Sequence, residues 1–583
     1  MRGLALAALV LATAPLYADY TPFYLGLLTE VLVFGLFALA YDVLLGHAGV
    51  LSLGHSAFIG VAAYVTGILL ARYQAPLEPS LLAGAVGGLL TSLILGVFVL
   101  RKRGVYLAML TLALSQVFYY VVLMWTPVTG GTDGLGNLPV LHLSAPLGWR
   151  LSKRPITRYY VIATVIFLAM LAIRHILRSP LGRVMRAVKA NETRAAACGY
   201  DTRRIKLAAF AISGFFSGLA GALLTVVLEF VPIENIHWQM SGTVLIMTLF
   251  GGTGTLLGPF VGAGLFIWMR DFVSKHLEYW EVFVGGVFVL IVLFFPDGIV
   301  GTLSRLLGRR GAVPLDDRPD HLPDPERLVG AAARRGDADE RLLESQALTK
   351  SFGGLTAVSH VDFRVLRGEL RSVIGPNGAG KTTFFNLLTG VLPPSGGRIL
   401  FKGQDITGLP AHAVSRLGIA RSYQVTNIFG DLTVFENVRI AAQSRVTHYR
   451  FWGSADRLAA VNERAEEILR HLGLADKRDA RGAELSHGEQ RYLEIGIALA
   501  TDPDFLLLDE PTAGMSPDET QRTAAFVRGL AGRVTIVVVE HDMEVVMGIS
   551  DRITVLNYGE VLAEGTPAEI RENADVRRVY LRD

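Results

Sequence analysis

The sequence predicts a multi-domain chain in which a polytopic α-helical membrane domain is followed by an α/β P-loop domain. The first half carries apolar stretches long enough to cross a bilayer, and 51% of the 583 residues are hydrophobic while only 18% are charged. The second half carries the motif GPNGAGKTT at residues 375–383, between a strand-like and a helix-like apolar run. We expect residues 1–307 to form the membrane domain, 308–342 a flexible linker rich in Arg, Asp, Pro and Gly, and 343–583 the α/β domain.

Eight apolar segments are candidate membrane spans, and most contain the roughly 20 apolar residues that a bilayer requires. They are Leu4–Tyr17, Phe23–Leu45, Val50–Ala71, Leu81–Leu100, Val105–Trp125, Tyr159–His175, Leu207–Phe230 and Val282–Phe295. The first has two interpretations. It is either the apolar core of a signal peptide or a retained helix, and we favour the retained helix because the spans that follow need an even count.

Charge predicts the orientation of these spans. Two basic loops, Arg101–Arg103 and the stretch between Arg174 and Lys206, are expected in the cytoplasm, and the loop Thr126–Arg158 outside. The segment Ser241–Arg270 is too short for two full crossings, and a single crossing would leave the C-terminal domain outside. Because glycines interrupt it at 251–254, we predict two half-helices that enter and leave on the same face.

Composition also excludes several kinds of site and partner. The formal net charge is +3, so no nucleic-acid partner is expected. Cys198 is the only cysteine, which excludes an intrachain disulfide and a zinc site built from several cysteines.

The motif at 375–383 predicts a site for ATP and Mg²⁺. Its glycines allow backbone N–H groups to surround phosphates, while Lys381 reaches the β- and γ-phosphates and Thr382 ligates Mg²⁺. A second apolar strand, 505–508, ends in two carboxylates. Asp509 is predicted to hold Mg²⁺ and Glu510 to polarise the attacking water.

From Leu343 onward the chain resembles the ATP-binding cassette (ABC) family. The stretch LSHGEQ at 485–490 is similar to the cassette signature, Gln424 to the glutamine that senses Mg²⁺ and the permease, and His541 to the switch histidine. Phe352 is placed like the aromatic residue that stacks on adenine, although ordinary core packing is an equal alternative. The resemblance implies a catalytic set Glu510, His541 and Gln424, a metal set Thr382, Gln424 and Asp509, and a nucleotide-binding set Phe352, Gly375, Asn377, Gly378, Gly380, Lys381, Thr382, Thr383, Ser486 and Gly488.

Two positions depart from the pattern of the family. His487 replaces a glycine of the signature, and Ser516 stands where an aspartate is usual. Because ATP in this family lies between two cassettes, the resemblance implies a second ABC ATPase subunit. The stretch Asn191–Gly199 resembles the coupling helix that importer permeases insert into a cassette, the alternative being a solvated basic loop.

The first half also resembles permeases for branched-chain amino acids. The similarity lies in LLGHAGVLSLGHSAF at 44–58, TGGTDGL at 129–135, GGTG at 251–254 and FPDG at 295–298. It implies an ATP-hydrolysing importer of branched-chain amino acids, or of related small amino acids or amides. The expected place is the bacterial inner membrane, with multiple passes and a cytoplasmic ATPase domain. The implied partners are a second permease subunit, a periplasmic substrate-binding protein and membrane lipid, and the alternative is a half-exporter that works as a homodimer.

Three polar residues of the membrane domain have open roles. Asp42 and Glu30 are costly to place in a bilayer and are expected to face the bundle interior, where a structural partner is favoured over a substrate contact. His55 could also line the transport path, but a role in helix packing between glycines is favoured.

Overall fold

The computed structural model describes residue 13 and residues 22–136, 155–307 and 340–580. The chain divides into two compact units. The first contains Met1–Lys189 and Arg203–Gly311, and the second contains Ala190–Thr202 and Ala312–Asp583. A short stretch that interrupts the first unit in sequence therefore groups with the second unit.

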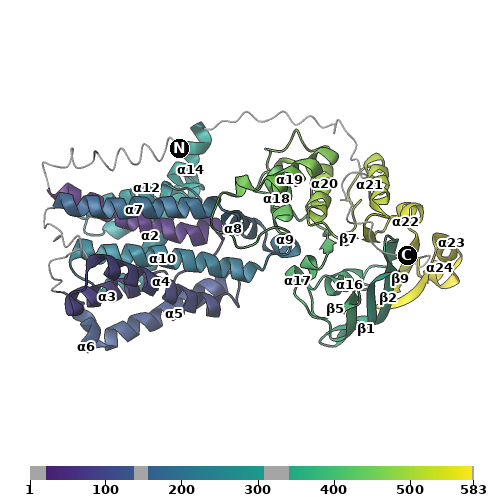
Figure 1. Cartoon of the computed structure of the whole chain (residues 1–583), viewed down its shortest axis with the longest axis horizontal. Coiled ribbons are helices and arrows are strands. Elements are labelled where there is room, and N and C mark those ends of the chain that lie inside the picture. The colour runs from purple at the N-terminus through teal and green to yellow at the C-terminus, as the bar shows by residue number, and fades with distance from the viewer. Residues whose placement is uncertain (1–12, 14–21, 137–154, 308–339, 581–583) are drawn as a thin grey trace. The chain divides into compact units, whose positions relative to one another are not determined.

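In its described part the first unit contains helices and their connections, with one isolated β-bridge between Leu135 and Val231 (Figure 1). Its α-helices are α2 (Pro22–Asp42), α3 (Ser56–Tyr73), α4 (Leu77–Val99), α5 (Val105–Met124), α6 (Thr126–Thr129), α7 (Pro155–Arg178), α8 (Pro180–Ala190), α10 (Thr202–Leu228), α11 (Trp238–Gly251), α12 (Gly258–Val273), α13 (Trp280–Phe294) and α14 (Gly298–Leu307). Within the described residues, seven helical stretches are long and apolar enough to cross a membrane. They confirm seven of the predicted spans, and the segment Leu4–Tyr17 lies outside the described residues.

The predicted half-helices are present as α11 and α12, with a connection at 252–257 between them. They pack closely because Gly262 carries no side chain: a Cβ at this position would collide with the carbonyl oxygen of Met247. Gly252 has φ +109°, a conformation that L-residues rarely adopt, so the break after α11 depends on glycine. The two short helices confirm the prediction of a broken segment.

Asp42 is fully buried and holds the connection between these two helices. At the end of α2, where the chain continues as one π-helical turn (Val43–His47), both carboxylate oxygens accept the N–H of Gly254, at 2.9 and 3.0 Å. Lys189, the last residue of the first unit before the inserted stretch, donates to the carbonyl of Gly46 in the same π-turn at 2.8 Å.

Glu30 and His55 also have partners inside the bundle. The Glu30 carboxylate forms a paired contact with Arg270 of α12, with N–O distances of 2.8 and 2.9 Å. The buried His55 ring is 2.8 Å from the hydroxyl of Ser213 and packs edge-on against Tyr41. The expectation of structural partners within the bundle is confirmed for these side chains.

The second unit contains two sheets. The antiparallel sheet has the order β2 (Leu355–Leu366), β1 (Arg341–Phe352), β4 (Gly396–Phe401), β5 (Gln404–Asp405). The other has the order β10 (Glu560–Gly565), β9 (Arg552–Asn557), β3 (Leu370–Ile374), β8 (Thr535–Val539), β7 (Phe505–Asp509), β6 (Ile419–Arg421), and all its pairs are parallel except β10–β9.

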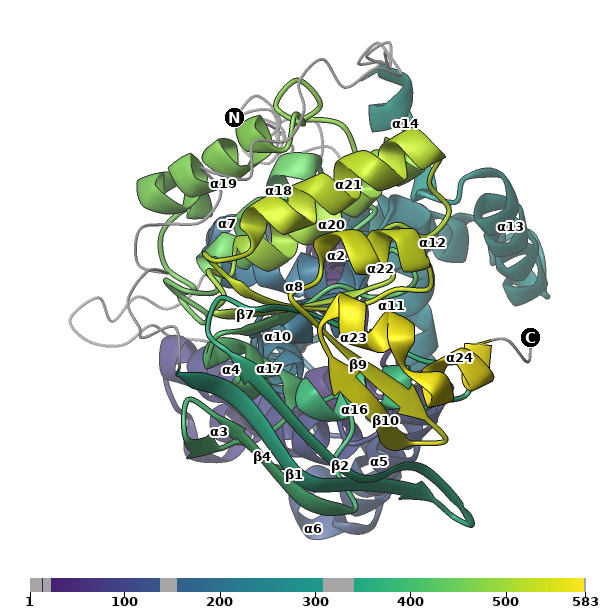
Figure 2. The ribbon, with the colours of Figure 1, turned by 90° about the vertical axis from the view of Figure 1, so that its right-hand side faces the viewer.

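Helices cover these sheets and complete the core of the second unit. They are α9 (Glu192–Ala197), α16 (Lys381–Leu388), α17 (Ala411–Arg416), α18 (Val434–Gln443), α19 (Ala459–His471), α20 (His487–Leu499), α21 (Pro517–Leu530), α22 (Met543–Ile549), α23 (Pro567–Glu572) and α24 (Ala574–Tyr580). Figure 2 shows α16 between the two sheets and α21 and α22 on the other side of the parallel sheet. Phe384 and Phe385 of α16 join the core that both sheets share. The α/β fold predicted for this part of the chain is confirmed.

Candidate functional site

The predicted site residues lie at the ends of four neighbouring strands, along one edge of the parallel sheet. The strands β3, β8, β7 and β6 lie side by side in that order and run in the same direction. Their carboxyl ends therefore meet at one edge, which is where ligands bind in open α/β sheets. The loop 375–380 follows β3, His541 follows β8, Asp509 and Glu510 close β7, and Gln424 follows β6.

The loop after β3 depends on glycine at both ends. Gly375 has φ +156° and Gly380 has φ +94°, and a Cβ at either position would collide with a backbone carbonyl, that of Leu556 or Ala357. These glycines let the loop turn sharply and begin α16 with its N–H groups directed into the loop. Such a helix N-terminus favours phosphate.

Lys381 is the first residue of α16, and its side chain lies inside this loop. Its ammonium donates to the carbonyls of Gly375 at 2.6 Å and Pro376 at 3.0 Å. Burial lowers the pKa of this lysine, and the charges of Glu510 and Asp509 oppose that shift. The loop thus holds the cation where the γ-phosphate of ATP is predicted to bind.

The structure brings the three predicted catalytic residues together. One oxygen of Glu510, Oε1, lies 2.9 Å from Nε2 of His541 and accepts the side-chain amide of Gln424 at 3.1 Å. Glu510 has φ +49°, a conformation that is uncommon for a residue other than glycine and that is frequent at functional sites. The strained backbone turns the carboxylate away from the buried strand and toward the loop side chains.

The predicted metal ligands fit Mg²⁺ by their chemistry. Asp509, Thr382 and Gln424 each offer an oxygen, which is the donor that Mg²⁺ prefers. Asp509 is 1% exposed, and its Oδ2 accepts from Arg421 at 2.9 Å. When Mg²⁺ is bound, these oxygens would hold it, and the ion would neutralise phosphate charge.

The signature residues lie at the N-terminus of α20. Ser486 caps this helix by accepting the N–H of Glu489, and both Ser486 and His487 are exposed. Ser516, the second departure from the family pattern, caps α21 in the same way through Glu519. Its hydroxyl therefore performs a local structural task that an aspartate is also able to perform.

Phe352 is 47% exposed at the end of β1, with the ammonium of Lys350 5.2 Å above its ring. This exposure disagrees with the alternative of ordinary core packing. Stacking on adenine stays a prediction.

Two buried cations beside the carboxylates were not predicted. Arg491 of α20 donates to the carbonyl of Glu510 at 2.5 Å and pairs with Glu494 at 2.9 Å. The second cation, Arg421, donates to the Asp509 carboxylate at 2.9 Å. The only signal in the sequence is a pair of opposite charges three residues apart, at 491 and 494, followed by the apolar run 495–499.

The inserted stretch 190–202 packs into the second unit through α9. Asn191 caps α9 by accepting the N–H of Arg194 at 3.0 Å, and its amide contacts Asn427. Arg194 is 1% exposed and donates to the carbonyls of Arg421 at 2.9 Å and Glu494 at 2.8 Å. The alternative of a solvated loop is therefore wrong for this side chain.

Two further hydrogen bonds fix the end of this stretch. Tyr200 is fully buried and donates to the carbonyl of Ile440 at 2.7 Å, and Arg416 donates to the carbonyl of Gly199 at 2.9 Å. Cys198 is 2% exposed between these contacts, and burial raises the pKa of its thiol.

Comparison with known proteins agrees with both parts of the chain. Residues 23–292 match the family described as branched-chain amino acid transport system / permease component. Residues 358–513 match the ABC transporter family, and residues 560–581 match the family described as branched-chain amino acid ATP-binding cassette transporter.

Two relatives and one solved structure align with the C-terminal part of the chain. The high-affinity branched-chain amino acid transport ATP-binding protein LivG of Escherichia coli K12 is 42% identical over 248 residues, which are 41% of this chain and 97% of LivG. The corresponding protein BraF of Pseudomonas aeruginosa is 41% identical over 249 residues, with the same shares. A nucleotide-free ATP-binding cassette from an ABC transporter is 29% identical, covering 41% of this chain and 99% of that chain, with a TM-score of 0.38.

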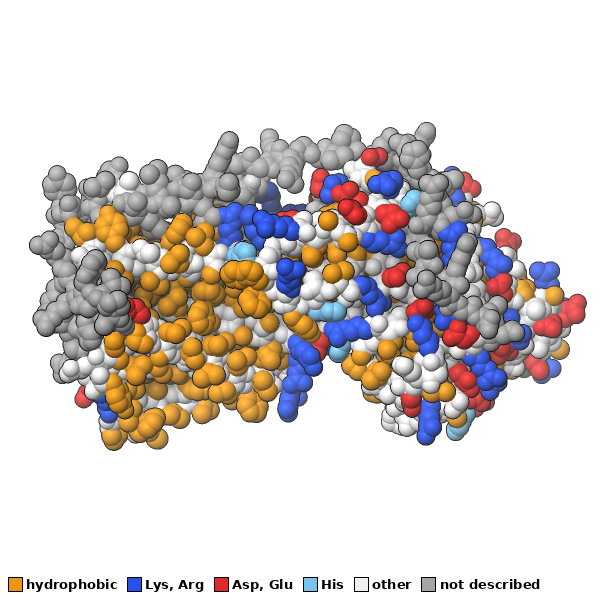
Figure 3. Space-filling view, in the orientation of Figure 1, with side chains coloured by type: hydrophobic (Ala, Val, Ile, Leu, Met, Phe, Trp, Pro, Cys, Tyr) orange, Lys and Arg blue, Asp and Glu red, His pale blue; other side chains and the backbone are white. Residues whose placement is uncertain are grey.

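Fold and site together define an ABC transporter chain, with a multi-pass permease region and a cytoplasmic ATPase cassette. Hydrophobic side chains cover the visible face of the helical unit, as expected for a surface in contact with lipid (Figure 3). The chain belongs to the branched-chain amino acid transport family of ABC transporters. Both family resemblances predicted from the sequence are confirmed.

Proposed function

We propose that this chain is one half of a bacterial importer, in which it supplies a permease and an ATPase for the uptake of branched-chain amino acids. The observation that carries the proposal is the packing of α9 in the cassette, where Arg194 binds the backbone of residues that are connected by hydrogen bonds to the predicted metal ligand and to the predicted catalytic residue. Arg194 reaches the carbonyl of Arg421, and the Arg421 side chain binds the Asp509 carboxylate. The stretch around α9 is thus proposed to transmit movement between ATP hydrolysis and the permease.

In the proposed hydrolysis step, Glu510 positions and polarises the attacking water, while His541 and Gln424 hold the Glu510 carboxylate in place. Lys381 would contact the β- and γ-phosphates of bound ATP, and Thr382, Gln424 and Asp509 would hold Mg²⁺. The exposed Ser486, together with Gly488, is proposed to contact ATP bound to the cassette of a partner subunit.

The architecture of the helical unit favours import over the half-exporter alternative. Half-exporters of the family are expected to have six long helices, whereas the described residues contain seven candidate spans and the broken pair α11–α12. Broken helices near buried polar groups are typical of substrate pathways. Asp42 and Gly254 are therefore proposed to lie close to that pathway and to shape it.

Reconstitution tests the proposal. In liposomes, the chain alone should show weak ATPase activity and no uptake, because one cassette provides only half of each ATP site. Addition of a second permease, a second ATPase and a leucine-loaded binding protein should restore both activities. A Lys381→Ala variant serves as the control, since it should abolish uptake without preventing assembly. Full-rate transport by the chain alone, as a homodimer without a binding protein, would contradict the proposal and support the exporter.

A further inference from the structure

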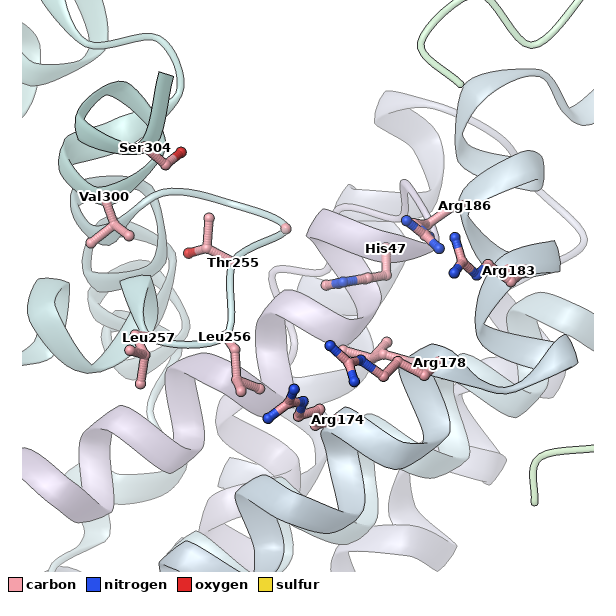
Figure 4. Close-up of a pocket in the computed structure, with 12 residues that line it drawn as sticks. His47, Arg174, Arg178, Arg183, Arg186, Thr255, Leu256, Leu257, Val300 and Ser304 are labelled. Atoms are coloured by element: carbon pink, nitrogen blue, oxygen red, sulfur yellow. The ribbon is translucent and has the colours of Figure 1, made fainter. Parts of the chain in front are cut away.

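The helical unit contains a basic cavity whose residues take no part in the predicted ATP site. Its volume is about 530 Å³, and four arginines come from α7 and α8: Arg174, Arg178, Arg183 and Arg186. Figure 4 shows their side chains directed toward a common space, with His47 between them. No Asp or Glu is among the residues that line this cavity in the described part of the chain.

The opposite wall belongs to the connection between the half-helices and to α14. Thr255 and Ser304 add hydroxyl groups, while Leu256, Leu257 and Val300 add apolar surface. The cavity therefore combines a concentrated positive charge with hydroxyl donors and an apolar rim. This combination suits a ligand that has an anionic head and an apolar body.

The arginines are expected to attract an anion strongly. Among the described residues, neither Arg174 nor Arg178 is paired with a carboxylate, and the two lie one helical turn apart on the same face of α7. Guanidinium groups bind phosphate oxygens in a planar, two-pronged geometry, which makes arginine well suited to phosphate recognition.

The location of the cavity indicates where such an anion comes from. The helix α8 leads directly into the stretch 190–202, which packs in the cytoplasmic cassette, so this end of α7 lies at the cytoplasmic face. Toward the membrane, the exposed Leu171 and Leu168 continue along the face that carries Arg174. Basic pockets between membrane helices on this side bind the head groups of anionic lipids.

We propose that this cavity is a binding site for the phosphate head group of an anionic phospholipid, whose acyl chains lie along α7. A bound head group would contact both α8 and the connection at 252–257, and it would thereby fix the segment that Asp42 also holds. The proposal is independent of the transported substrate, since it rests on the geometry of the cavity.

Lipid binding to the purified full-length chain tests the proposal. Native mass spectrometry should detect retained phosphatidylglycerol or cardiolipin in preference to phosphatidylcholine. In the double variant Arg174→Gln/Arg178→Gln, affinity for anionic lipid should fall by about 30-fold, because each cation lost near an anionic surface weakens binding about fivefold. The matched control is Arg101→Gln/Arg103→Gln, in another basic loop outside the cavity, and it should retain the lipid.

Several outcomes would overturn the proposal. Equal retention of anionic and zwitterionic lipid, or equal losses in the two double variants, would do so. Displacement of the lipid by millimolar inorganic phosphate would assign the cavity to a soluble anion instead. If the double variant fails to assemble, the exposed Arg178 alone provides the test, because Arg178→Glu should lower lipid retention and Arg178→Lys should largely preserve it.

Discussion

Removal of the Arg194 side chain should release α9 from the cassette. The guanidinium is 1% exposed and donates to two carbonyl groups, at 2.9 and 2.8 Å. A hydrogen bond to a charged group contributes about 1.5–3 kcal/mol, so the pair stabilises the docked state by about 3–6 kcal/mol. Hydration of the freed carbonyls recovers a part of this energy, and Arg194→Ala should weaken docking by about 3 kcal/mol, or a factor of roughly 10².

The single cysteine reports docking directly. Cys198 is the only cysteine in the chain and is 2% exposed, and burial raises the pKa of its thiol, so its alkylation requires the stretch 190–202 to open. The rate of maleimide labelling should therefore rise roughly 100-fold in Arg194→Ala, since labelling of a buried group follows the population of the open state.

Two matched variants control this measurement. Arg203→Ala removes an exposed arginine of α10 whose hydrogen bond, to the carbonyl of Val97, is 3.4 Å long, and it should label at the wild-type rate. Arg194→Lys keeps the charge without the two-pronged geometry and should give an intermediate rate. If Arg194→Ala labels as slowly as the native protein, while the unfolded chain labels rapidly, the argument that these hydrogen bonds hold α9 is refuted.

Three further predictions concern other parts of the chain. Glu510→Gln should preserve ATP binding and slow hydrolysis by about 10²–10³-fold when the partner cassette is disabled, and wild-type turnover would contradict the role of Glu510. Asp42→Asn should retain transport because an amide oxygen still accepts the N–H of Gly254, whereas Asp42→Ala should lose most of it; equal uptake by both variants in liposomes would refute this. Burial lowers the pKa of His448 from 6.5 to about 4, so the unfolded chain takes up the proton first and thermal stability should fall as pH drops from 6.5 toward 4. His448→Gln should flatten that dependence of Tm on pH, and an unchanged slope would exclude His448 as its source.

Local sequence patterns predicted the elements that carry the ATP site. The loop at 375–383 and the apolar strand before Asp509 have fixed spacings because the backbone itself binds phosphate and the strand must be buried on both faces. Glycines at 251–254 predicted the broken helix because the connection between two half-helices requires backbone angles that glycine adopts readily. The P-loop, the buried strand and the broken helix each depend on residues that are close together in the chain, so local sequence patterns predict them.

Contacts between distant segments were not predictable in this way. Asp42 is held by the N–H of Gly254, 212 residues away, and any residue other than proline offers the same donor. Arg194 likewise binds carbonyl oxygens, which every residue carries. The partners of Asp42 and Arg194 thus depend on the folded arrangement of the backbone, and no spacing in the sequence identifies them.

The hydrogen bonds of the second unit connect α9 by short routes to Asp509 and Glu510, the predicted metal ligand and the predicted catalytic carboxylate. Arg194 binds the carbonyls of Arg421 and Glu494; the Arg421 side chain then binds Asp509, and the Glu494 carboxylate binds Arg491, which donates to the carbonyl of Glu510. A displacement of Asp509 or Glu510 during hydrolysis must strain these buried bonds, because a charged group that loses its partner inside a protein is costly. We therefore expect Arg421 and Arg491 to transmit movements of Asp509 and Glu510 to α9. For this reason Arg194→Ala should preserve hydrolysis in the assembled complex and abolish its stimulation by loaded binding protein.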